Sequence, residues 1–191
     1  MSRKWISGAA VAASLAALAA GIATPTAALA HFVKAPCDFI TSGGYVFKDD
    51  GQDVNFGAHG GCKNNDFWGH VNIVDHETNW HLSSTQITGY LFDPAQPNAR
   101  DICGMAETND GITVQFRVHL VDNGEPGTSD QFGLIVDTRN QVPGDRFLLV
   151  RSRNISGGNV QLHKDNPSTT ASAQMRSLQE WQMCGDLNSP Q

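Results

Sequence analysis

Histidine, asparagine and glutamine side chains recur at alternate positions of three segments, residues 53–61, 67–76 and 113–120. Each segment alternates between apolar and polar side chains, the period of two that is typical of a half-buried β-strand. If the strands share a sheet, the imidazoles, amides and one guanidinium gather on one face. These residues are His59, His70, Asn72, His76, Gln115, Arg117 and His119. Imidazoles and amides both donate and accept hydrogen bonds, so we predict a binding face for a glycan or a cell-surface partner.

The same residues allow two other interpretations. A semi-buried polar layer, covered by a loop or by the C-terminal tail, would satisfy its hydrogen bonds internally and be purely structural. Converging imidazoles would instead bind zinc or copper, because histidine is the commonest metal ligand, and would make the protein a secreted metalloenzyme of hydrolytic type. The order of the strands decides between these interpretations, and the sequence does not fix that order.

A loop at residues 122–130 carries four oxygen-bearing side chains within nine positions. They belong to Asp122, Asn123, Glu125 and Asp130. Hard cations such as Ca²⁺ take several oxygen ligands from flexible loops, so calcium is the cofactor that this spacing suggests. The spacing does not match an EF-hand, and Asp and Asn also favour turns by bonding their own backbone. A well-capped hairpin loop is therefore the alternative interpretation.

The first 30 residues are typical of a secretory signal peptide. Arg3 and Lys4 precede an apolar run over residues 6–20, and Ala28 and Ala30 form a small-x-small cleavage site. We therefore expect a secreted or cell-surface protein. No second apolar run reaches the roughly 20 residues that a membrane-spanning helix needs, so no span is expected in the mature chain.

Cleavage after Ala30 would place His31 at the new N-terminus. A terminal amine beside an imidazole is similar to the copper site at the start of lytic polysaccharide monooxygenases, although the rest of the chain does not resemble that family. His31 is thus a candidate copper ligand. No GxSxG, HExxH or P-loop motif is present, so no catalytic residue is assigned. The net charge of −6 argues against nucleic acid as a partner.

Four cysteines in an exported chain suggest two disulfides, for which three pairings exist. We favour Cys62–Cys103 within the domain. Cys37 and Cys184 would then join the two ends of the chain, because the termini of a domain often lie close together.

Short strands separated by turn residues predict an all-β fold: an antiparallel β-sandwich or flattened barrel of about eight to nine strands. The expected β domain covers residues 31–166. Residues 167–191 form a flexible tail by composition, with a short helix expected within residues 175–183.

Four segments carry a family resemblance. They are CDFITSGGYVF at 37–47, NFGAHGGCKNNDFWGHVNIVDH at 55–76, VDNGEPGTSDQF at 121–132 and GGNVQLHK at 157–164. Together they resemble the post-COAP-1 type of domain of exported bacterial proteins, over residues 36–165. The resemblance implies a secreted β-rich module and implies no catalytic residues.

Overall fold

The computed structural model describes residues 31–32, 37–138 and 147–190, so the expected signal peptide lies outside the described residues. Its strands are β1 (His31–Phe32), β2 (Phe39–Phe47), β3 (Asp53–Lys63), β4 (Asp66–Asp75), β5 (Trp80–Asp93), β6 (Gln96–Thr108), β7 (Thr113–Val121), β8 (Gln131–Asp137), β9 (Phe147–Asn154) and β10 (Gly157–His163). They form one antiparallel sheet in the order β10-β2-β3-β4-β5-β6-β7-β8-β9, with β1 beside β5. The predicted all-β fold class is confirmed.

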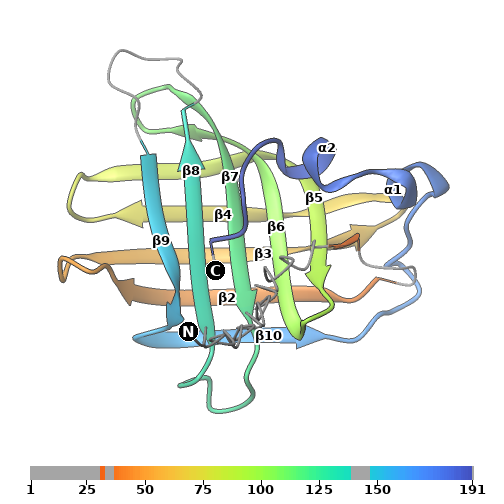
Figure 1. The fold of residues 1–191 in the computed structure, drawn as a ribbon, viewed down its shortest axis with the longest axis horizontal. Coiled ribbons are helices and arrows are strands. Elements are labelled where there is room, and N and C mark those ends of the chain that lie inside the picture. The colour runs from red at the N-terminus through yellow and green to blue at the C-terminus, as the bar shows by residue number, and fades with distance from the viewer. Residues whose placement is uncertain (1–30, 33–36, 139–146, 191) are drawn as a thin grey trace, which may run out of the picture.

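The sheet curls strongly, so that it forms half of a barrel (Figure 1). Strands β2, β3, β4 and β10 run across the view behind β6, β7, β8 and β9, which run nearly at right angles to them. The curl passes through β5, whose pairing with β6 shifts register three times, first between Ser84 and Gln86. Because a bulge bends its strand and increases its twist, these irregularities turn the sheet back over itself.

The inner face of the curled sheet holds the core. Apolar side chains alternate inward as predicted, with Val71 and Ile73 on β4 and Phe116 and Val118 on β7 all buried. The rings of Phe56 and Phe132 stack across the interior with centroids 4.0 Å apart. The outer face of the sheet is therefore where the polar residues of each strand must lie.

Strand β10 lies at the edge of the sheet, and the loop of residues 122–130 covers its free side. The carboxylate of Asp130 accepts hydrogen bonds from the backbone N–H groups of Val160 (2.7 Å) and Asn123 (2.8 Å). The carboxylate of Asp122 accepts hydrogen bonds from the backbone N–H groups of Leu162 (2.7 Å) and Gly124 (2.9 Å). An uncovered edge is a site for unwanted strand pairing, so the loop protects the fold.

The disulfides are Cys37–Cys62 and Cys103–Cys184, so the predicted pairing of Cys62 with Cys103 and of Cys37 with Cys184 is wrong. The β2–β3 register pairs Phe39 with Gly61, which brings Cys37 beside Cys62. Cys103 lies on the outer face of β6, where the C-terminal segment reaches it. Two disulfides are compatible with an extracellular protein.

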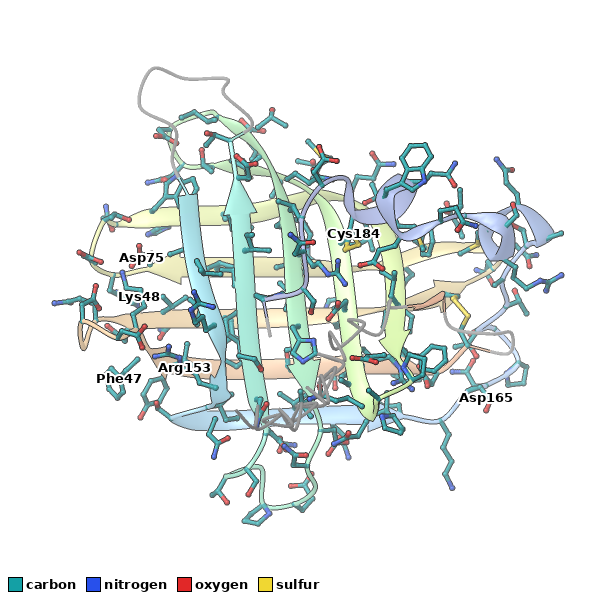
Figure 2. All side chains as sticks on the ribbon, in the orientation of Figure 1. Phe47, Lys48, Asp75, Arg153, Asp165 and Cys184 are labelled. Carbon is teal, nitrogen blue, oxygen red and sulfur yellow. A yellow bond between two sulfur atoms is a disulfide. The ribbon has the colours of Figure 1, made fainter. Side chains whose placement is uncertain are left out.

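The C-terminal segment lies along the outer face of the sheet, in place of the free tail that its composition suggested. It contains two short helices, α1 (Ala173–Ser177) and α2 (Glu180–Cys184), where one was expected. The disulfide to Cys184 and a hydrogen bond from Ser152 N–H to the Pro190 carbonyl (2.7 Å) fasten it (Figure 2). In the described part of the chain, no helix has the length and apolar character needed to cross a membrane.

Candidate functional site

The C-terminal segment divides the polar residues of the outer face into two groups. Gln115, Arg117 and His119 of β7 point outward from the core as expected, yet all three are buried. Alternation in the sequence predicts the face of the sheet on which a side chain lies, but it does not predict whether another segment covers that face. The prediction that they share one exposed face with His59 and His70 is therefore corrected.

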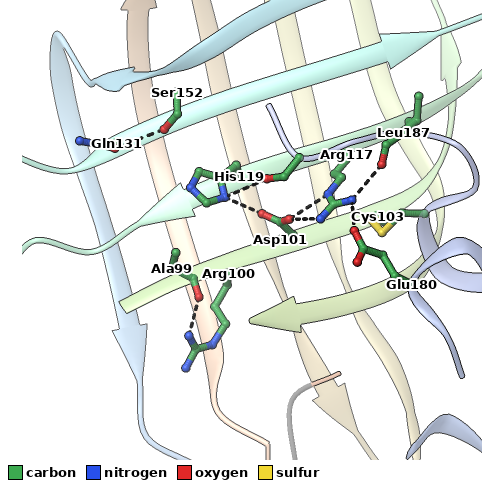
Figure 3. A network of polar contacts seen from close by, with 12 residues as sticks. Ala99, Arg100, Asp101, Cys103, Arg117, His119, Gln131, Ser152, Glu180 and Leu187 are labelled. Atoms are coloured by element: carbon green, nitrogen blue, oxygen red, sulfur yellow. Dashed lines mark hydrogen bonds and ion pairs between the residues drawn. A yellow bond between two sulfur atoms is a disulfide. The ribbon is translucent and has the colours of Figure 1, made fainter. Parts of the chain in front are cut away.

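Arg117 is the centre of a buried ionic network (Figure 3). Its guanidinium donates to Asp101 Oδ2 (2.8 and 2.5 Å), to Glu180 Oε1 (2.6 Å) and to the Leu187 carbonyl (2.8 Å). Burial alone would raise the pKa of Asp101, but a hydrogen bond with His119 and the charge of Arg117 outweigh it and lower the pKa. The network links the sheet to the C-terminal segment.

The network is not a catalytic triad. His119 Nδ1 lies 2.6 Å from Asp101 Oδ1 and 3.5 Å from Ser189 Oγ, so the acid and the hydroxyl meet the same ring nitrogen. A triad requires the acid on one nitrogen and the nucleophile on the other. What the described contacts show is a bond between the sheet and the C-terminal segment.

The exposed polar face lies on the outer side of β10, β2, β3 and β4, which we call the candidate face. Thr41, His59 and His70 are direct neighbours across β2, β3 and β4, and Asn72 follows His70 on the same side of β4. His70 is fixed on both ring nitrogens, by Ser84 Oγ at 3.0 Å and by Asn72 Nδ2 at 2.9 Å. Of the seven predicted ligand-binding residues, these three (His59, His70 and Asn72) come together here.

Aromatic rings lie beside these polar groups. Phe39 of β2 stacks on His163 of β10 with ring centroids 4.5 Å apart and planes within 7°. The ring centroid of Trp68 on β4 lies 6.1 Å from that of Phe39 and 5.1 Å from that of His59. All of these side chains are partly exposed. Partly exposed aromatic rings beside hydrogen-bonding groups form a surface that is apolar in part and polar in part.

His59 is one of the polar residues of the candidate face whose side chain has no hydrogen-bond partner within the described residues. Within the described residues, neither of its ring nitrogens nor the indole N–H of Trp68 forms a hydrogen bond, whereas His70 and His163 are bonded. Burial, with a smaller effect of His70, lowers the pKa of His59, so its ring is neutral at pH 7. A neutral imidazole can donate one hydrogen bond and accept another.

The remaining predicted residues lie elsewhere. His76 follows β4 at its far end, with Nε2 4.0 Å from Asp53 Oδ2. The backbone of His31 pairs with Phe92 of β5, and its side chain lies outside the described residues. In the loop of the predicted calcium site, the carboxylates of Asp122 and Asp130 accept hydrogen bonds from backbone N–H groups. The carboxylate of Glu125 accepts one from the side chain of Asn159 (3.1 Å). Across the described ranges, no three His, Cys, Asp or Glu residues are grouped to hold a metal ion.

A shallow hollow adjoins the candidate face where β4 meets β5 and β6. It has a volume of about 440 Å³. Its exposed lining residues are Asn72, His81, Ser83, Glu107 and Asn109. Amide, imidazole, hydroxyl and carboxylate groups thus surround a space that solvent reaches.

The sequence analysis did not assign Phe39 or Trp68 to the site. The sequence contains the information, because residues two positions apart in a strand lie on the same face of the sheet. Trp68 is two positions from His70, and Phe39 is two positions from Thr41. Comparison of the chain with protein-family models, with curated proteins and with solved structures yields no match. The resemblance to post-COAP-1 domains stays a prediction, and the function must be argued from the geometry.

Proposed function

We propose that this protein is an exported, non-catalytic module that binds a glycan on the candidate face. The main support is His59, which lies half-buried between Trp68 and His70 and whose ring nitrogens form no hydrogen bond with the part of the chain that the structure describes. A sugar ring offers an apolar face to an aromatic side chain and hydroxyl groups to an imidazole. Export agrees with the two disulfides and with the N-terminal sequence.

The composition of the candidate face gives further support. An ordinary solvated sheet face carries mainly Lys, Glu and Thr, whose side chains extend into water. Here the outward positions of β2, β3 and β4 include Phe39, His59, Trp68, His70 and Asn72, whose side chains have few rotatable bonds. Such side chains lose little conformational entropy when they hold a ligand. The lysine among the outward positions is Lys63 at the end of β3, whose ammonium lies 5.4 Å from the Trp68 ring centroid.

A glycan array followed by titration of the purified protein tests the proposal. We expect Trp68→Ala to weaken binding about tenfold or more and His59→Ala about threefold to tenfold, from the lost ring contact and hydrogen bonds. Trp181 on α2 is 67% exposed and lies outside the candidate face, so Trp181→Ala is the matched control. His76→Ala is the control for His59→Ala.

A blank array would overturn the proposal and favour a structural module. So would binding that Trp68→Ala and Trp181→Ala change to the same extent. Unfolding curves of all four variants ensure that a loss of binding does not come from a loss of fold.

A further inference from the structure

A row of directly paired residues crosses six strands of the sheet on the candidate face and its continuation. From β10 to β6 the row is Asn159, Gly43, Gly57, Asn72, Ser83 and Glu107. Adjacent strands lie about 4.8 Å apart, so five steps follow the curled sheet for roughly 24 Å. The row runs at right angles to the strands.

The middle of the row is low, because Gly43 and Gly57 have no side chains. A Cβ atom at Gly57 would meet nothing within 4 Å, and one at Gly43 only the Phe56 carbonyl at 4.0 Å. The neighbouring rows carry large side chains, His59 on one side of Gly57 and Asn55 on the other. At β2 and β3 the row is therefore a trough, flanked by His59 and Thr41 on one side and by Asn55 and Tyr45 on the other.

One end of the trough opens into the hollow beside Glu107. Asn72 and Ser83 belong both to the row and to the lining of the hollow, so the two are continuous. At the other end Asn159 donates to Glu125 of the loop that covers β10 (3.1 Å). Each end thus holds a carboxylate with an amide nearby, a pair that can bind adjacent hydroxyl groups.

Charge narrows the ligand class. No residue of the row carries a positive charge, its two ends are acidic, and the whole chain has a net charge of −6. An anionic sugar would meet repulsion at both ends. The end at β6 is open, because Thr113, the residue that pairs with Glu107 on β7, is exposed, whereas the loop of residues 122–130 bounds the end at β10.

We infer that the site binds an extended, uncharged polysaccharide, which lies across the strands along this trough. This inference rests on the proposed function and adds the ligand class and its direction. A ligand that spans about 24 Å contacts both ends of the trough, whereas a single sugar contacts one part of it.

Calorimetric titration with length series tests the inference. The probes are cello-, xylo- and manno-oligosaccharides, from monosaccharide to octasaccharide, with oligogalacturonides as the anionic counterpart. In at least one neutral series we expect affinity to rise by tenfold or more with length and then level off. The oligogalacturonides should not bind.

Gly57→Leu fills the trough, and open space around its Cβ lets the fold accommodate it. We expect it to weaken binding of the longest bound oligosaccharide at least tenfold, with an unchanged unfolding curve. Gln86→Leu, at an exposed position of β5, is the matched control and should leave binding unchanged.

The outcomes separate the two proposals. Absence of glycan binding overturns both. Short sugars that bind as tightly as long ones, with dependence on Trp68 and none on Gly57, overturn only the extended-chain inference. Tighter binding of oligogalacturonides overturns the uncharged class.

Discussion

Replacing Arg117 by Met tests whether the buried ionic network holds the C-terminal segment on the sheet. The Arg117 side chain is 1% exposed and donates to Asp101, to Glu180 and to the Leu187 carbonyl. Methionine keeps an apolar side chain of similar length but leaves the Asp101 carboxylate buried without its cation. Removal of one partner of a buried ion pair costs about 3–5 kcal/mol. We expect that loss in the free energy of unfolding, measured with urea at pH 7.

The pH dependence of this loss has a definite sign. In the parent protein the pKa of Asp101 is lowered despite burial. The ionised Asp101 therefore stabilises the fold above the pKa of about 4 that an aspartate has in the unfolded chain, and this stabilisation is lost only below that pH. Without the charge of Arg117 the pKa of Asp101 is higher than in the parent, although the hydrogen bond with His119 remains, so acid protonates the buried group of the variant first. The gap between variant and parent should therefore narrow from about pH 7 to about pH 4.

Arg151→Met is the control for this experiment, because Arg151 is exposed on β9. Its effect should stay within about 0.5 kcal/mol. A loss below about 1 kcal/mol for Arg117→Met at pH 7, or a gap that widens on acidification, would refute the reasoning.

Two further perturbations test the fold. Replacing Cys103 and Cys184 by Ser should cost about 4.5 kcal/mol, and replacing Cys37 and Cys62 about 3.5 kcal/mol, because the first bridge closes the longer loop. The sequence separations are 81 and 25, and the reverse order in urea unfolding would contradict this account. Asp130→Ala leaves two backbone N–H groups without their acceptor and should cost about 2–4 kcal/mol. Because its carboxylate is engaged, Ca²⁺ should not change the Tm of the parent; a calcium-dependent rise would support the cation site instead.

The sequence predicts which side of each strand is apolar, because alternation is a local property of an extended chain. Val71 and Ile73 point into the core and His70 and Asn72 away from it, as the pattern requires. The fold class follows from the same signal. Alternation does not say which outward residues are later covered, and this is why Arg117 and the rest of the β7 set were placed on an exposed face.

The features that the sequence could not supply all depend on contacts between distant segments. The cover over Arg117 comes from residues more than 60 positions later in the chain, including Glu180. Asp130 looks like a turn residue or a cation ligand in sequence, whereas its partner is the edge strand 30 positions away. The disulfide pairing depends on the β2–β3 register, which brings Cys37 beside Cys62.

The two halves of the outer face differ in how their polar groups are satisfied, and this difference supports a ligand on only one of them. Under the C-terminal segment, Arg117, Asp101 and His119 are all bonded within the chain, as expected of a structural polar layer. On the candidate face, His70 is bonded within the chain, but His59 and the Trp68 indole are not, within the described residues. Water satisfies these groups in the free protein, and a bound sugar would replace that water. The binding function that we propose therefore depends on β2, β3 and β4, where hydrogen-bonding groups and aromatic rings stay open to solvent.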